Sequence, residues 1–113
     1  MAQFPCLPLW TDAWVADTKH LSLAARGVYM DLLVLMWRTP YCHVPDDNGW
    51  LQVHLGITKD ELRDYLRPVI EEFCKVEGNF VVQHRLQKEF VRSSNNSRKQ
   101  SDLAKRRWQK QKG

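Results

Sequence analysis

The chain has 113 residues and a formal net charge of +4, and this length corresponds to one small domain and argues against a two-domain enzyme. The charge is uneven, because residues 92–113 hold eight Lys/Arg and one Asp, whereas the residues before them hold nine Lys/Arg and twelve Asp/Glu. A cationic block beside an acidic body is typical of a tail that binds an anionic partner, of which nucleic acid is the commonest. The alternative is a solvated tail that only aids solubility.

Compartment and redox state follow from what the sequence lacks. No N-terminal stretch has the basic and apolar regions of a secretory signal, and the longest apolar run, from Val28 to Trp37, is interrupted by Asp31 and is too short for a membrane span. The three cysteines form neither a C-x-x-C pair nor a disulfide framework. We therefore expect a cytoplasmic protein with free thiols, without membrane contact, bound metal or cofactor.

The first nineteen residues carry prolines and the tryptophans Trp10 and Trp14 without a helical period, so they predict an extended arm or a short strand with aromatic anchors. Ser22 is then a good N-cap for a core helix that runs to about Arg38. The apolar residues that fall close to a 3.6-residue period in this helix are Leu23, Tyr29, Leu32, Leu33, Met36 and Trp37.

Thr39-Pro40 ends this helix, and the loop YCHVPDDNG follows, in which Asp46 or Asp47 can cap a short helix that Gly56 closes. Thr58 and Glu61 form a T-x-x-E capping box at the start of the next helix. A short helix, a glycine turn and a capped helix are the outline of a helix-turn-helix.

The third helix buries a stripe made of Leu62, Leu66, Val69, Ile70 and Phe73. Pro68 lies within it and predicts a kink, or alternatively a break at Arg67. Two β-prone runs joined by Gly78-Asn79 come next and predict a hairpin. A hairpin directly after a recognition helix is a wing.

These elements predict an α+β, mainly α fold: a winged helix-turn-helix with a β-hairpin wing and a basic C-terminal helical tail. Residues 1–91 would form the winged-helix domain with its N-terminal arm, and residues 92–113 a partly helical tail. Helical spacing of apolar residues continues to Val91, a polar break covers Ser93 to Ser97, and a second helical segment can start at Ser101.

Several strings together resemble the YdaU-like prophage family: PLWTDAWVADTKHLS, RGVYMDLLVLMWR, VPDDN, LGITKDEL and LRPVIEEF. The resemblance covers roughly residues 5–90 and implies a winged-helix protein related to phage replisome organisers. Its matching positions are Asp17-Thr18, Leu21-Ser22, Tyr29 and Trp37-Arg38, and these motifs are structural rather than catalytic. The basic tail is similar in kind to the tails that follow this domain in relatives.

Nothing in the sequence points to catalysis. The four histidines, His20, His43, His54 and His84, have no evident nucleophile or carboxylate pair beside them, and the phosphate-binding pattern G-x-x-x-x-G-K is absent. We therefore expect a binding protein rather than an enzyme.

The candidate recognition helix gives two readings. Lys59, Arg63 and Arg67 follow i, i+4, i+8 spacing and would lie along one edge, available to DNA. Equally, the same residues could pair with Asp60, Asp64 and Glu71 in a solvated face. From Lys59 to Glu72 the helix holds three Lys/Arg against five Asp/Glu, which is a poor fit to a groove lined by phosphates.

The tail supplies the charge that this helix lacks, since Lys and Arg neutralise phosphates with little sequence preference. Trp108 would stack on an exposed base, or dock on the body or on a second copy of the chain. The residues expected to contact DNA outside the helix are Arg85, Lys88, Arg98, Lys99, Lys105, Arg106, Arg107, Trp108, Lys110 and Lys112.

We conclude from the sequence that this is a phage- or prophage-type protein that binds DNA, duplex or single-stranded, in replication or its regulation. The alternative is an adaptor that uses the same fold to bind a replication, transcription or host-defence protein. The DNA site, the protein partner and the oligomeric state stay open.

Overall fold

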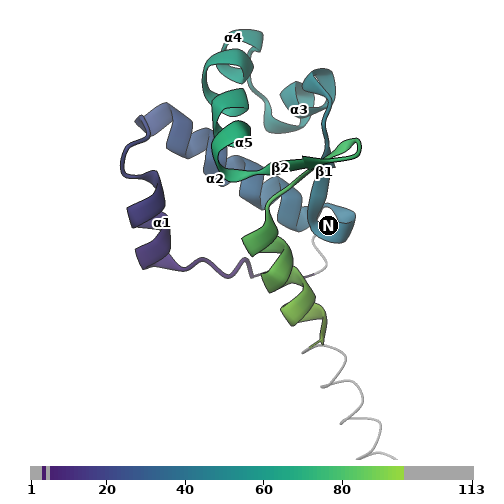
Figure 1. The fold of residues 1–113 in the computed structure, drawn as a ribbon. Helices are drawn as coiled ribbons and strands as arrows, with labels where there is room; N and C mark the ends of the chain where they lie inside the picture. Colours follow the sequence, from purple (N-terminus) through teal and green to yellow (C-terminus); the bar gives the residue numbers. More distant parts are fainter. Residues whose placement is uncertain (1–3, 5, 96–113) are drawn as a thin grey trace, which may run out of the picture.

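The computed structural model describes residues 4 and 6–95 of the chain. It is mainly helical and carries one small three-stranded antiparallel sheet (Figure 1), so the predicted α+β, mainly α class is confirmed. The elements are α1 (Thr11–Thr18), α2 (Leu23–Arg38), η1 (Pro40–Cys42), β1 (His43–Pro45), α3 (Asn48–Leu55), α4 (Lys59–Glu61), η2 (Leu62–Leu66), α5 (Arg67–Phe73), β2 (Lys75–Glu77) and β3 (Phe80–Val82). An unlabelled last helix covers residues 84–95.

Helix α1 corrects the prediction of an extended arm or strand, which holds only up to Trp10. The helix has no side-chain cap, and its apolar residues do not form one face, since Val15 is exposed while Trp14 stacks on the Tyr29 ring at 5.3 Å. Its end is fixed by Thr18, whose buried hydroxyl donates to the Trp14 carbonyl at 2.6 Å. Packing against Tyr29, rather than a local pattern, therefore holds α1 in place.

Helix α2 forms the centre of the core, as predicted. The Ser22 hydroxyl accepts a hydrogen bond from the Ala25 backbone N–H at 3.1 Å, which caps the helix at the expected residue. The helix packs against α3, η2 and β1. Trp37 near its end is 3% exposed, and its indole N–H donates to the Phe4 carbonyl at 2.8 Å.

Strand β1 lies in the segment that the sequence predicted to be loop throughout. It pairs antiparallel with β3, which places β3 in the centre of the sheet in the order β1-β3-β2. The strand is only three residues long and ends in Pro45, and Val44 alone among its residues is buried, so it offers no alternating pattern to detect.

Helix α3 and the following helix match the prediction closely. Of the two candidate caps, Asp47 is the one used, and its side chain accepts from the Trp50 backbone N–H at 2.9 Å. Gly56 ends α3 in the left-handed conformation with φ of +64°. Both hydrogen bonds of the Thr58–Glu61 capping box are present.

The third helix does not break at Arg67, and a π-helical turn over Leu62–Leu66 precedes Pro68. The backbone N–H of Arg67 bonds to the Leu62 carbonyl, five residues back, and the torsions of Leu66 and Arg67 stay helical. One wide turn gives the proline ring space without interrupting the helix. Elements α4, η2 and α5 therefore form one continuous helix.

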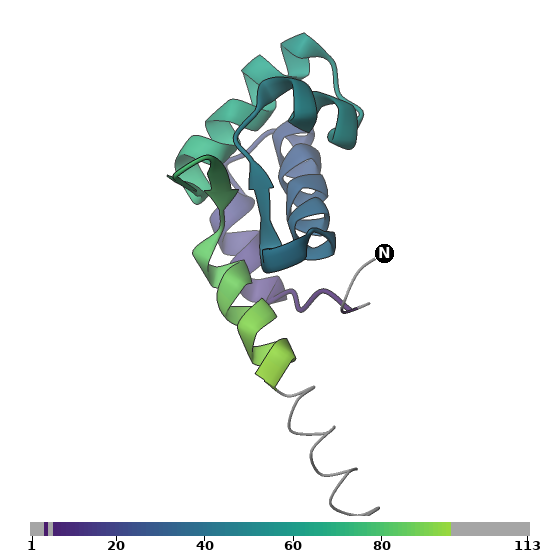
Figure 2. The same ribbon diagram turned by 90° about the vertical axis from the view of Figure 1, so that its right-hand side faces the viewer.

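The hairpin is confirmed: β2 and β3 pair with Glu77 opposite Phe80, and Gly78 takes φ of +63° in the turn. The last helix extends away from the body (Figures 1 and 2). It begins after Gln83, whose side-chain oxygen accepts from the Leu86 N–H at 2.8 Å. It continues through Ser93 and Ser94, so the polar break predicted to begin at Ser93 is wrong.

Candidate nucleic-acid interface

Arg63, on the exposed side of the third helix, is held by carboxylates of its own helix. Its guanidinium donates to both carboxylate oxygens of Asp64, at 2.9 and 3.2 Å, and lies 3.3 Å from Asp60. The side-chain hydrogen bond to Asp64 raises the pKa of Arg63, and the same bond lowers the pKa of the Asp64 carboxyl. This pairing corresponds to the solvated salt-bridged face that the sequence left open.

Arg67, unlike Arg63, bonds to side chains outside the third helix. It reaches back across the helix-turn-helix, where its guanidinium pairs with Asp46 at 2.6 Å and also bonds to the Asn48 side chain. A π-helical turn over Leu62–Leu66 contains Arg63 and ends just before Arg67, so the two arginines do not follow an uninterrupted α-helical register. Both arginines are thus already paired with acidic side chains, and the row of Lys59, Arg63 and Arg67 as a DNA contact stays a prediction.

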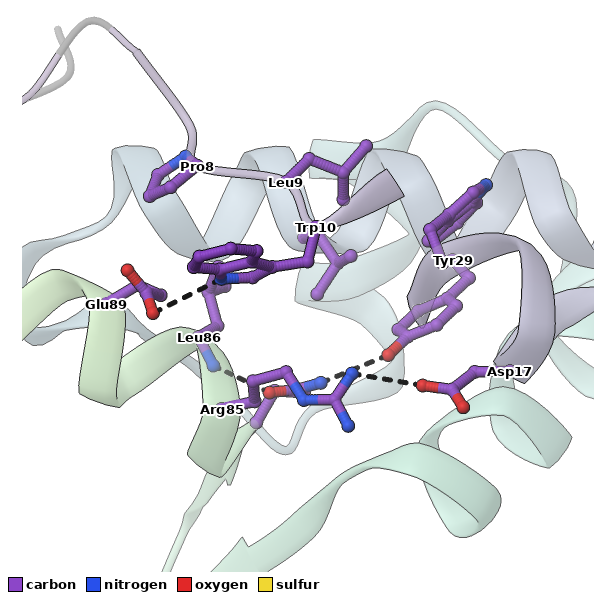
Figure 3. A pocket seen from close by; sticks show the side chains of 11 residues that line it. Pro8, Leu9, Trp10, Asp17, Tyr29, Arg85, Leu86 and Glu89 are labelled. Atoms are coloured by element: carbon purple, nitrogen blue, oxygen red, sulfur yellow. Dashed lines mark hydrogen bonds and ion pairs between the residues drawn. The ribbon is translucent and has the colours of Figure 1, made fainter. Parts of the chain in front are cut away.

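Arg85 lies on the last helix and faces Asp17 of α1 (Figure 3). Its guanidinium is 3.0 Å from the Asp17 carboxylate of α1. Next to it, the Gln83 amide donates to the Tyr29 hydroxyl at 3.1 Å, and burial raises the pKa of that phenol. Arg85 therefore joins α1 to the last helix in this structure.

The same junction encloses a small cavity between Pro8, Trp10, Trp14 and the last helix, shown in Figure 3. Its volume is about 50 Å³, far below the several hundred cubic ångströms that small-molecule sites require. The Trp10 indole crosses its rim and donates to Glu89 at 3.4 Å. The junction is thus a contact between two segments rather than a ligand pocket.

Lys88 lies in a larger groove, of about 570 Å³, between the last helix and Tyr41. Sequence reasoning identified Lys88 but missed Tyr41, whose side chain is 78% exposed. Its sequence position could have identified Tyr41, because it directly follows the helix-ending Thr39-Pro40, where an aromatic residue has no helix face to pack against.

The remaining candidate residues lie outside the described part of the chain. They are Arg98, Lys99, Lys105, Arg106, Arg107, Trp108, Lys110 and Lys112. Within the described residues, no three or more His, Cys, Asp or Glu side chains are grouped so that they could hold a metal ion. None of the helices in this same part of the chain combines the length and apolar character needed to cross a membrane.

A protein-family model described as "Protein of unknown function (DUF1376)" matches residues 5–90. The chain belongs to this DUF1376 family. No curated protein and no solved structure matches it. The DUF1376 match runs from the N-terminal arm into the last helix and stops before the cationic segment, so the family signature corresponds to the folded body.

Proposed function

We propose that this DUF1376 protein is a winged-helix DNA-binding protein of the phage or prophage type, which acts in the cytoplasm in DNA replication or its regulation. The observation that carries the proposal is the order and pairing of α3, Gly56, the continuous helix α4–α5 and the hairpin β2–β3, with β1 added to the same sheet. A helix-turn-helix followed by a paired hairpin is the arrangement that a winged helix needs. The resemblance of the sequence to YdaU-like proteins supports the phage setting.

The uneven distribution of charge suggests different roles in DNA binding for the body and for the basic C-terminal segment. The body before residue 92 has a formal charge of −3, and residues 92–113 have +7. Arg63 and Arg67 are both bonded to acidic side chains, so the third helix offers few free cations to phosphates. In the proposal, residues 98–112 supply most of the affinity, and the body positions the complex and provides any sequence preference.

A salt titration of DNA binding tests this division. If about four to six phosphates are contacted, log K should fall against log salt with a slope of roughly −4 to −5 on duplex DNA. Replacing Lys105, Arg106 and Arg107 together by Gln should weaken binding to all sequences alike and flatten the slope by about 3.

A control variant changes charge on the body alone. Lys19→Gln with Arg38→Gln removes two exposed charges that lie just after α1 and at the end of α2, and its salt slope should stay near that of the parent. If the triple variant instead keeps the parental affinity and slope, the tail is not the DNA contact and the proposal fails.

One observation favours a second candidate, an adaptor for a basic protein surface. The exposed side of α4–α5 carries Asp60, Asp64, Glu71 and Glu72, and such a surface repels phosphates but attracts cationic partners. This candidate gains support if the parent chain shows no salt-dependent binding to duplex or single-stranded DNA.

A further inference from the structure

Three rings follow one another on the outer side of the sheet. Tyr41 lies 6.0 Å from His43, centroid to centroid, and His43 stacks on Phe80 at 4.0 Å with an interplanar angle of 9°. The opposite side of the same strands belongs to the core through Val44 and Val81. We call Tyr41, His43 and Phe80 the aromatic strip.

The backbone beneath the strip is strained. Tyr41 has φ of +63° and Cys42 has φ of +54°, and both are non-glycine residues in the left-handed region, where side chains other than Gly and Asn are disfavoured. Cys42 turns into the core and is fully buried, whereas the Tyr41 ring turns outward and is 78% exposed. Packing explains Cys42 but gives no reason for a tyrosine at position 41, where glycine would form the same backbone without strain.

The strip opens at Tyr41 into the groove of about 570 Å³ along the last helix. The helix contributes residues at i, i+3, i+4 and i+7, which share one face. They are His84, Gln87, Lys88 and Val91, with Phe90 beside them. Among the described residues none of those lining the groove is a carboxylate, and the lining residue His84 is bonded to Glu77 at 2.6 Å.

We propose that the aromatic strip and this groove bind single-stranded nucleic acid. The exposed rings of Tyr41 and Phe80 can stack on bases of any sequence, and Lys88 provides the cation for an adjacent phosphate. The groove has the volume of a nucleotide-sized site, and the helix that lines it leads along the chain into the cationic segment. The proposal rests on the proposed function, because it names the form of nucleic acid and the surface that receives it.

The decisive variant is Tyr41→Gly, which removes the ring and relieves the positive φ, so it should fold at least as stably as the parent. A labelled oligothymidylate of about 15 nucleotides is titrated into the full chain and into this variant. We expect the variant to bind the single strand about 5- to 100-fold more weakly. Tyr41→Phe keeps the ring and should bind like the parent.

Lys88→Gln should flatten the salt slope on the single strand by about 0.7. A duplex of matched length separates this proposal from the proposed function, because the tail should hold the duplex equally in the parent and in Tyr41→Gly. If both proteins bind single strand with equal affinity, the groove is not the site, although the protein still binds DNA. If the parent binds neither form, both proposals fail, and a protein becomes the better candidate for the groove.

Discussion

Gly27 and Gly56 occupy opposite kinds of backbone position, and alanine should have opposite effects at the two. Gly56 has φ of +64°, whereas Gly27 lies inside α2, and a Cβ at either position would meet nothing within 4 Å. Gly56→Ala should therefore cost about 1–2 kcal/mol through backbone strain alone. Gly27→Ala should stabilise the protein by about 0.5–1 kcal/mol. Urea denaturation measures both, and destabilisation by Gly27→Ala would show that this site is more crowded than the structure describes.

The three cysteines should differ sharply in reactivity. Cys6 is exposed, whereas Cys42 and Cys74 are buried, and burial raises the pKa of both buried thiols to about 12 from 9.0. A thiol reagent such as DTNB, added to the native protein at neutral pH, should therefore modify only Cys6 rapidly. Fast reaction of a second thiol would mean that η1 or the end of α5 opens readily.

The same thiols make stability depend on pH in the alkaline range. Since their pKa is higher in the folded state, the unfolded chain loses these protons first as pH rises. Their contribution is complete below about pH 9 and is lost progressively between the values of 9.0 and about 12. The urea midpoint of unfolding should fall across that pH interval. In a double Cys42→Ser, Cys74→Ser variant that still folds, this fall should be smaller, because the two buried thiols no longer contribute to it.

At the scale of elements, the two arginines of the third helix should contribute differently to stability. Arg67 is 31% exposed and joins α5 to Asp46 and Asn48 at the start of the helix-turn-helix. Arg67→Ala should lower the free energy of unfolding by about 1–2 kcal/mol, a range that allows for screening of this partly exposed ion pair by solvent. Arg63→Ala is the matched control: its pairs are exposed and lie within one helix, so its melting temperature should stay near that of the parent. Equal losses would contradict the assignment of Arg67 as the bridging residue.

The elements that the sequence predicted well are those with local chemical markers. Ser22, Asp47, Gly56 and the Thr58–Glu61 pair each satisfy backbone groups within a few residues, and the structure uses every one. Helix α1 and strand β1 have no such markers and depend on distant partners, Tyr29 for α1 and β3 for β1.

The candidate site shows the same limit. Local spacing offered the pairing of Arg63 with its neighbours Asp60 and Asp64 as one of two alternatives, and the structure shows these pairs. The bond from Arg67 to Asp46 joins residues 21 positions apart, and a π-helical turn directly precedes Arg67 in the chain. Apolar periodicity does not distinguish one such turn from an ordinary α-helix, so the direction of Arg67 was beyond sequence reasoning.

For the whole molecule, the body should fold without the cationic segment. All described members of the core and the side chains packed on it lie between Phe4 and Phe90. A chain cut after Asn95, at the end of the described helix, should therefore keep a cooperative melting transition within a few degrees of the parent. The same cut should remove most DNA affinity if the proposed function is right. Loss of cooperative melting would show instead that residues 96–113 belong to the core.

The junction between the N-terminal arm and the last helix also constrains how the chain folds. Its contacts join residues far apart in sequence: 68 positions for Asp17 and Arg85, and 79 for Trp10 and Glu89. Closing such long loops costs more chain entropy than forming the local turns of the helix-turn-helix. The arm should therefore dock last, and during synthesis the Trp10 indole lacks its Glu89 partner until the last helix has left the ribosome.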